Sequence, residues 1–240
     1  MTLQTIRREI VRFARRMQAD GLVAGTAGNI SCRIPEEGTV AITPSGFPYE
    51  EMQPEDVPVI DVHGSVVVGS RIPSTEWRLH LAIYQARPDI GAIIHTHEIY
   101  SSVLAVLHRP LPPIVEELVR YVGGQVEVAA YAPAQSCELA RNVVVALEGR
   151  AAALIANHGN VACGADLAQA YHVGQIVGRV AKVYILASLL GNPLALPLAV
   201  VEREQREFVK RIRGDTADDG RRGRLDGHPD LASVGVAAPI

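Results

Sequence analysis

The stretch GAIIHTH, residues 91–97, joins a short apolar run to two histidines at its end. An apolar run of this length, preceded by Pro88-Asp89, predicts a buried β-strand. Because successive side chains of a strand alternate between faces, His95 and His97 project to the same side and can bind one ion together. The H-x-H pattern is short, and two unrelated polar residues at a strand end explain it equally well when it is considered alone.

A second apolar stretch, AALIANHG at residues 152–159, also ends in a histidine, His158, and a glycine follows it. Glycine permits close backbone approach in a turn. Three neutral imidazoles with a carboxylate or water form a normal tetrahedral ligand set for Zn²⁺, and Mn²⁺ or Co²⁺ can occupy the same ligands. The alternative for His158 alone is an ordinary hydrogen-bonded loop histidine.

The segment PSTE, residues 73–76, predicts a helix start, with Ser74 or Thr75 able to cap a helix that runs through Arg87. Unpaired backbone N–H groups at such a start can bind an anion. Glu76 is therefore the candidate carboxylate beside the metal, and its alternative is a first-turn glutamate favoured by the helix dipole. His80 lies one turn further on the same face, and we interpret it as a supporting or core residue.

Two further loops have the composition of an anion cradle. GTAGN (residues 25–29) and TPSG (residues 43–46) supply flexible backbone donors together with hydroxyl or amide side chains. Neither matches the G-x-G-x-x-G or the P-loop pattern, which disfavours a dinucleotide or ATP site. Taken singly, each is typical of an ordinary turn.

Away from these motifs, helical and extended patterns are interspersed along the chain. An amphipathic helix is predicted from Leu3 to Met17, ended by Asp20-Gly21, and a long helix from Leu167 to Leu190, ended by Gly191. Shorter helices are predicted up to about residue 107 and over 138–147, and strands over 39–43, 57–61, 65–68, 91–97, 126–130 and 152–156. This interspersion predicts α/β layering, whereas periodicity leaves strand order open.

The composition indicates one globular domain, which we assign to residues 1–213. The remaining residues, 214–240, are rich in Gly, Asp and Arg, and we expect them to form a mobile tail. A formal charge of −3 gives nucleic acid or an anionic membrane no special attraction. Residues 1–21 lack the apolar core of a secretory signal, and the most apolar run, AKVYILASLLG, is too short to span a bilayer. We therefore expect a cytoplasmic protein.

Two residue types bear on the chemistry. The three cysteines, Cys32, Cys137 and Cys163, lack paired metal-type spacing, and we expect reduced core thiols. The only lysines are Lys182 and Lys210, on the long helix and near the C-terminal helix. Neither has the setting of a buried catalytic amine, so a lysine Schiff base is not expected.

Five motifs occur in one order: GTAGNIS (25–31), ITPSGFPYEEM (42–52), PSTEWRLHLAIY (73–84), IIHTH (93–97) and ANHG (156–159). This combination resembles the class II aldolase/adducin family, and within it the sugar-phosphate aldolases of the fuculose-phosphate type. The resemblance implies a three-layer α/β/α domain with a largely antiparallel central sheet. It also implies a cyclic homotetramer with each active site near a subunit interface.

The resemblance assigns roles to individual positions. Zinc is expected on His95, His97 and His158, with Glu76 as the acid/base carboxylate that also binds the empty metal. The phosphate-binding positions are Gly28, Asn29, Ser45, Gly46, Ser74 and Thr75. The sequence departs from the family at residues 112–117, where related enzymes carry a tyrosine that reaches a neighbouring subunit. Glu116 or Glu117 contacts substrate hydroxyls there, or both are exposed at a helix start; Phe208 is a candidate for the C-terminal aromatic residue.

The activity implied is reversible cleavage of a ketose 1-phosphate to dihydroxyacetone phosphate and a small aldehyde. Cleavage leaves an enediolate whose negative charge the metal stabilises. One alternative keeps the metal and changes the reaction to that of a pentulose-phosphate 4-epimerase, a dehydratase or a decarboxylase. The other is a non-enzymatic scaffold like adducin, against which the retention of all three histidines and Glu76 argues.

Overall fold

An eight-stranded sheet forms the centre of the computed structural model, which describes residues 1–34 and 38–213. The strand order is β4-β3-β2-β1-β5-β8-β7-β6. The strands are β1 (Asn29–Ile34), β2 (Thr39–Ile42), β3 (Val59–Ile60), β4 (Val66–Val68), β5 (Ala92–Thr96), β6 (Val128–Ala129), β7 (Ala152–Ile155) and β8 (Gly159–Gly164). Neighbouring strands are antiparallel except β6 and β7, which are parallel. The predicted, largely antiparallel sheet is confirmed.

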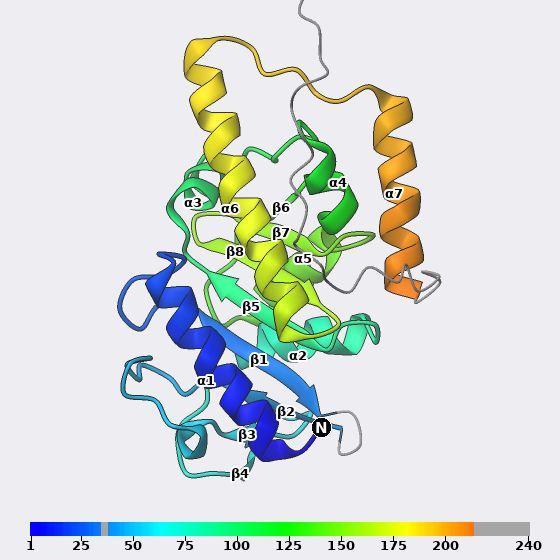
Figure 1. The fold of residues 1–240 in the computed structure, drawn as a ribbon. Helices are drawn as coiled ribbons and strands as arrows, with labels where there is room; N and C mark the ends of the chain where they lie inside the picture. The colour runs from blue at the N-terminus through cyan, green and yellow to red at the C-terminus, as the bar shows by residue number, and fades with distance from the viewer. Residues whose placement is uncertain (35–37, 214–240) are drawn as a thin grey trace, which may run out of the picture.

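Helices cover both faces of this sheet (Figure 1). They are α1 (Leu3–Ala19), α2 (Trp77–Ala86), α3 (Ile99–Val106), α4 (Glu116–Val122), α5 (Cys137–Ala146), α6 (Leu167–Leu190) and α7 (Leu198–Arg213), with a short 3₁₀ helix η1 (Pro54–Asp56). One face packs against α1 and α6, and the other against α2 and α5. The three-layer α/β/α architecture is therefore confirmed.

The two long helices on the first face begin and end where the sequence predicts. Thr2 caps α1 by accepting a hydrogen bond from the Thr5 backbone, and Asp166 caps α6 by accepting one from Gln169. Gly21, with φ of +71°, follows the end of α1, and Gly191 follows the end of α6. These caps fix the helices that lie against the central strands.

Two central strands, β1 and β8, are absent from the sequence prediction. The β1 segment NISCRI and the β8 segment GNVACG mix small and polar residues with few β-branched ones, so local propensity is weak. Pairing on both sides stabilises them instead, because β1 lies between β2 and β5 and β8 lies between β5 and β7. The predicted strand at 126–130 shortens to the two residues of β6.

Helix α6 is longer and more apolar than the expectation about membrane spans assumed. Over its full 24 residues it is long and apolar enough to cross a membrane by length and composition, although the apolar run considered from sequence is shorter. Its buried residues extend from Leu167 to Ala181 and pack against the sheet. The first part of α6 is thus a core helix.

Burial also distinguishes the three cysteines. All are free thiols, and Cys32 and Cys163 are buried as expected. Cys137 is exposed at the start of α5, so the prediction of a core position is wrong for it. Burial raises the pKa of Cys32 and of Cys163 to about 12, which keeps both protonated and unreactive.

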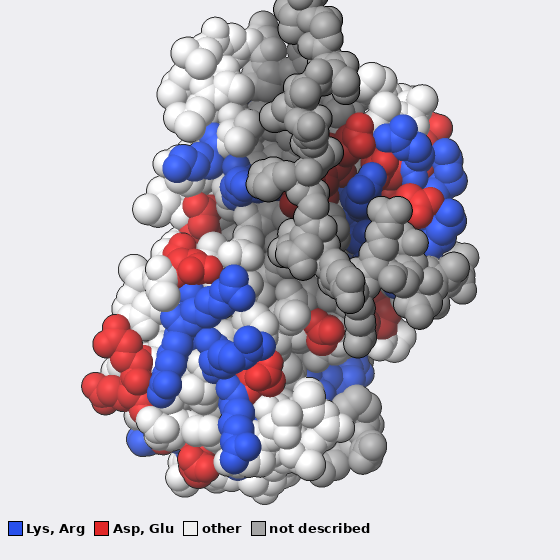
Figure 2. All heavy atoms as spheres, in the orientation of Figure 1, with Lys and Arg blue, Asp and Glu red and all other residues white. Residues whose placement is uncertain are grey.

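Charges of both signs appear on the face seen in Figure 2, where arginine side chains gather over α1 and a mixed group lies over α7. Exposed ion pairs on these two helices include Arg12 with Glu9 on α1 and Lys210 with Glu207 on α7. The expected tail at 214–240 lies outside the described residues.

Candidate active site

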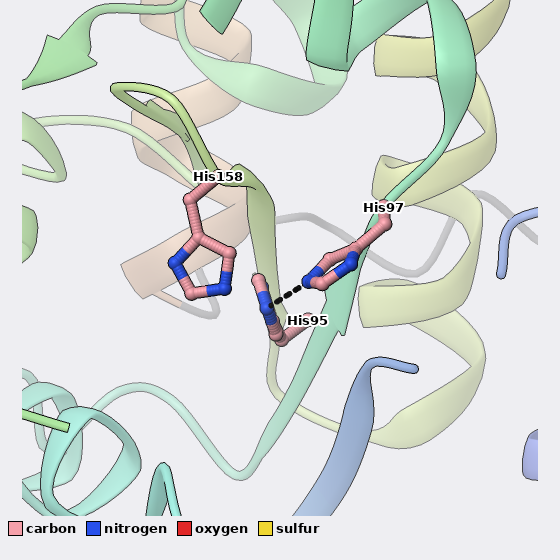
Figure 3. Close-up of side chains that lie close together, drawn as sticks. All are labelled: His95, His97 and His158. Atoms are coloured by element: carbon pink, nitrogen blue, oxygen red, sulfur yellow. Dashed lines mark hydrogen bonds between the residues drawn. The ribbon is translucent and has the colours of Figure 1, made fainter. Parts of the chain in front are cut away.

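Three histidines point toward one another at one end of the central strands (Figure 3). One nitrogen from each of His95, His97 and His158 lies within 4.8 Å of the others. The Nε2 atoms of His95 and His97 are 3.0 Å apart, and the three ring centroids are 4.8 to 5.0 Å apart. The structure therefore brings together the histidines that the sequence singled out.

The strands explain this convergence. His95 lies within β5 and His97 directly follows it, while β5 pairs with β8 so that Thr96 lies opposite Asn160. The hairpin turn between β7 and β8 consequently meets the end of β5. His158 lies in this turn, whereas the sequence placed it at the end of the strand before the turn.

Gly159 makes the close approach possible. A Cβ atom at this position would lie 2.3 Å from the Thr96 carbonyl oxygen and 3.0 Å from Cδ2 of His97. Only glycine fits there without moving the backbone. The prediction that glycine after His158 allows close backbone approach is confirmed.

Glu76 supplies a carboxylate to the same cluster. Its Oε2 lies 3.2 Å from Nε2 of His95, and its Oε1 lies 3.3 Å from Nε2 of His158. Asn29 donates a hydrogen bond of 2.8 Å to Oε2. One carboxylate thus contacts strand β5 and the β7–β8 turn at once.

The predicted start of α2 needs a correction. The helix begins at Trp77, Glu76 is its N-cap residue, and the Glu76 side chain makes no capping bond. Ser74 accepts a hydrogen bond from the Glu76 backbone and holds the preceding turn. The alternative of a first-turn glutamate that serves only the helix dipole is therefore wrong, because the carboxylate turns toward the histidines.

Electrostatics favour an ionised Glu76. Burial opposes its charge, but His95, His158 and the Asn29 amide outweigh burial and lower the pKa of Glu76 well below its usual range. Burial lowers the pKa of His97 to about 4, helped by His95 and His158, and likewise lowers the pKa of His158. Burial opposes protonation of His95, yet Glu76 raises the pKa of His95. Glu76 and His95 thus favour each other's charged form.

These residues fit a divalent cation. Oε1 of Glu76 is buried without a hydrogen-bond partner, and a cation between the carboxylate and the imidazoles satisfies that oxygen. Three imidazole nitrogens and one carboxylate oxygen are the donor set of tetrahedral zinc sites. The histidine cluster could therefore hold a metal ion, with Glu76 beside it.

The three loops predicted to bind phosphate lie next to one another. Pro44 and Pro73 form an isolated β-bridge, Ser45 donates its backbone N–H to the Ile72 carbonyl, and Ser74 donates to the Thr43 carbonyl. Thr43 in turn accepts a hydrogen bond from the backbone of Ile30, at the start of β1. Of the predicted residues, Ser45, Gly46 and Thr75 are exposed and able to contact a ligand, whereas Ser74 and Asn29 are buried.

Comparisons with known proteins identify the family of the chain. The family profile described as Class II Aldolase and Adducin N-terminal domain matches residues 8–185. The chain belongs to the class II aldolase and adducin family. The family assignment covers every element that carries a residue of the cluster, and the α/β/α fold expected from it is the one observed.

Relatives and solved structures align over most of their lengths. The chain is 37% identical over 214 residues to 5-deoxy-D-ribulose 1-phosphate aldolase of Bacillus thuringiensis, covering 89% of this chain and 98% of that protein. It is 34% identical over 216 residues to L-fuculose phosphate aldolase of Escherichia coli O6:H1, covering 88% and 99%. A solved L-fuculose 1-phosphate aldolase superposes with a TM-score of 0.82 at 40% identity, covering 85% and 96%. These matches support the prediction of a class II aldolase, which is a carbon–carbon lyase.

The two glutamates in the segment where the sequence departs from the family form ion pairs within the protein. Glu117 pairs with Arg179 and Glu116 with Arg203, at the start of α4. Phe208 is buried between α7 and the core on the α6 face. The structure brings none of these three side chains into contact with the histidine cluster among the hydrogen bonds and ion pairs of the described residues.

Sequence reasoning missed Asn160. Its backbone oxygen lies 2.8 Å from Nδ1 of His95, which directs Nε2 toward the cluster, and its side chain donates to Thr96 and Ser101. No local signal identifies this role, because a backbone carbonyl is common to every residue. Neither lysine takes part: Lys182 lies over the Tyr100 ring and Lys210 pairs with Glu207.

Proposed function

We propose that this class II aldolase uses a divalent metal, zinc in the first instance, to cleave a ketose 1-phosphate reversibly into dihydroxyacetone phosphate and a small aldehyde. The observation that carries the proposal is the Glu76 carboxylate, held within 3.3 Å of both His95 and His158 beside a three-histidine cluster. A partly buried base next to a cation site is the minimal machinery for moving a proton at a carbon adjacent to a carbonyl.

The metal would be held by His95, His97 and His158, with Glu76 as a further ligand when substrate is absent. A bound divalent ion supplies positive charge that withdraws electrons from a carbonyl and stabilises negative charge developing on its oxygen. Zinc is favoured over harder cations because three of the four donors are imidazole nitrogens, although Mn²⁺ and Co²⁺ accept the same set.

Glu76 holds and moves the proton at the reacting carbon. In the cleavage direction the C4 hydroxyl gives its proton to the ionised Glu76 carboxylate, the C3–C4 bond breaks, and its electron pair forms an enediolate over C2 and C3 while C4 leaves as an aldehyde. Glu76 then delivers that proton to C3, which completes dihydroxyacetone phosphate and restores the carboxylate. In the synthesis direction the ionised Glu76 removes that proton again.

The phosphate end of the substrate is assigned to the adjoining loops. Ser45, Gly46 and Thr75 are exposed next to one another, and the Gly28 turn lies against the His95 backbone. Backbone and hydroxyl donors from three loops would fix the phosphate and hence the position of C3 relative to Glu76.

The relatives named above suggest two candidate sugars. We infer that the substrate belongs to the short ketose 1-phosphates, with 5-deoxyribulose 1-phosphate and fuculose 1-phosphate as the compounds to test first. An epimerase, dehydratase or decarboxylase of the same fold would consume related sugars without releasing a triose phosphate. Product analysis on this panel separates the reactions.

The deciding experiment is Glu76→Gln in protein whose metal content equals that of the wild type. We expect kcat for release of dihydroxyacetone phosphate to fall by about 10²–10⁴-fold, because the base is removed while the ligand geometry stays similar. Glu148→Gln, at an exposed position on the surface, is the matched control and is expected to retain full activity. A Glu76→Gln enzyme with the wild-type rate would show that another group moves the proton.

We also propose that the enzyme works as a cytoplasmic homotetramer. Exposed leucines at the end of α6 and in the following segment, among them Leu189, Leu190 and Leu194, support burial of this surface in an assembly. Light scattering on the purified protein measures the assembly, and a monomer of full activity would contradict it.

A further inference from the structure

Four buried side chains lie in a row behind Glu76. Asn29, Ser31, His80 and Tyr84 are at most 5% exposed, so water does not compete for their hydrogen bonds. Consecutive members are 2.5 to 2.8 Å apart: His80 Nε2 to Asn29 Oδ1, His80 Nδ1 to Ser31 Oγ, and Ser31 Oγ to Tyr84 OH. The row ends at Glu76, whose Oε2 accepts from Asn29 Nδ2.

Regular structure sets the spacing of this row. Asn29 and Ser31 are two residues apart on β1 and therefore face the same side of the sheet. Glu76, His80 and Tyr84 are four residues apart at the start of α2 and along it, and therefore share one helix face. Strand and helix contribute alternate members: Asn29 and Ser31 come from β1, and His80 and Tyr84 come from α2, the helix that Glu76 precedes.

The charge of Glu76 fixes the direction of every hydrogen bond. A carboxylate only accepts, so Asn29 must turn its NH₂ toward Glu76 and its oxygen toward His80. His80 must then donate from Nε2 and accept at Nδ1, which requires Ser31 to donate to His80 and Tyr84 to donate to Ser31. The reverse arrangement would place the Asn29 oxygen against the Glu76 carboxylate, where two acceptors repel.

We propose that Asn29, Ser31, His80 and Tyr84 form a one-directional hydrogen-bond chain that anchors Oε2 of Glu76 and leaves Oε1 as the oxygen that exchanges the proton. His80, Ser31 and Tyr84 are positioning residues, since they act through Asn29. Oε1 is the buried oxygen without a hydrogen-bond partner, and it faces the His158 side of the cluster. This inference rests on the proposed function for the role of Glu76.

Burial is consistent with a neutral His80. Removal from water lowers the pKa of His80 to about 3, with His95 adding to the effect and Glu76 opposing it. A neutral ring has one donor and one acceptor nitrogen, which is what the chain requires. At the far end of the hydrogen-bond chain, the backbone carbonyl of Tyr84 accepts a hydrogen bond from the Arg33 side chain, which holds Tyr84 in place.

The first test uses the metal-free wild-type protein and needs no activity. Two-bond ¹H–¹⁵N correlation spectra distinguish the Nε2–H tautomer, the Nδ1–H tautomer and the imidazolium of each of the eight histidines. His80→Gln assigns the signal by its disappearance. We expect His80 as the Nε2–H tautomer from pH 5.5 to 8.5, and an Nδ1–H tautomer or an imidazolium overturns the proposal.

The second test separates positioning from mere packing. His80→Phe removes the donor to Asn29, and we expect kcat to fall by about 10–100-fold, as for other residues that orient metal-site groups, with KM within about twofold. His80→Gln retains an N–H donor and is expected to recover most of the loss. Tyr84→Phe leaves the direction of the hydrogen-bond chain intact and is expected to lower kcat by about three- to tenfold.

Tyr171→Phe is the matched control for Tyr84→Phe, because it also deletes the hydroxyl of one buried tyrosine, here bonded to Asp20 at the end of α1. It should destabilise the protein without altering kcat. Folded His80→Phe protein with wild-type kcat would overturn the proposal. Wild-type protein that releases no dihydroxyacetone phosphate would refute the proposed function instead, while the tautomer measurement still decides the direction of the chain.

Discussion

Replacing Gly159 with alanine tests whether the metal centre depends on backbone contact between the β7–β8 turn and β5. The added Cβ would lie 2.3 Å from the Thr96 carbonyl oxygen, about 1 Å inside ordinary van der Waals contact. Because the neighbouring oxygen belongs to the backbone, the overlap is relieved only by moving the strand end or the turn. The former carries His95 and His97, and the latter carries His158.

The expected magnitude follows from this overlap. Overpacking of a well-packed site costs about 1–3 kcal/mol, which for a chain of this size lowers Tm by roughly 2–4 °C per kcal/mol. A displacement near 1 Å at the reacting groups lowers kcat by about 100-fold. The affinity for zinc should fall by about 10–100-fold, since the histidines separate.

Calorimetry, zinc titration and the aldolase assay measure the three effects. Gly174→Ala is the matched control, because its Cβ would meet only the Ala162 side chain at 3.6 Å, an ordinary contact, in the middle of α6. Alanine favours the helix there and should leave stability unchanged or raise it by up to about 1 kcal/mol. A Gly159→Ala protein with wild-type zinc affinity and Tm would refute the reasoning.

Three further predictions concern the metal, pH and the phosphate loop. Removing the metal with a chelator should lower Tm by roughly 5–10 °C, because a metal ion at 100 times its Kd adds about 2.7 kcal/mol to the free energy of unfolding. The Tm of His95→Ala protein should not respond to the chelator. As the pH falls from 6.5 to about 3, the folded pKa of His80, the metal-free protein should lose about 1.4 kcal/mol of unfolding free energy per pH unit, because only the unfolded chain protonates this histidine. Urea unfolding across this range measures the loss, and the unfolding free energy of His80→Gln should depend less steeply on pH. Tyr49→Phe removes the hydroxyl that donates to the Ala27 and Gly28 carbonyls. It should lower the free energy of unfolding by about 1 kcal/mol and raise KM for the phosphorylated substrate. An unchanged KM would show that the loop holds its shape without this bond.

The amino-acid sequence by itself determined the long helices and the identity of the cluster. Helices α1 and α6 carry their own caps and apolar faces, so local pattern defines their ends. The histidines and Glu76 could be selected because few residue types bind zinc and each of them borders an apolar run or a helix start. The family motifs added the layered fold.

Only the tertiary structure decided how these pieces meet. Strands β1 and β8 form because neighbours pair with them on both sides, and their own residues do not predict it. The Glu76 carboxylate points away from the first turn of α2. It does so because its partners lie elsewhere: Asn29 on β1, and the histidines of β5 and of the β7–β8 turn. The order of the chain behind it, alternating between β1 and α2, likewise depends on packing between elements some fifty residues apart. Local sequence encodes the propensity of each element, whereas hydrogen bonds between distant elements are set only when burial brings those elements together.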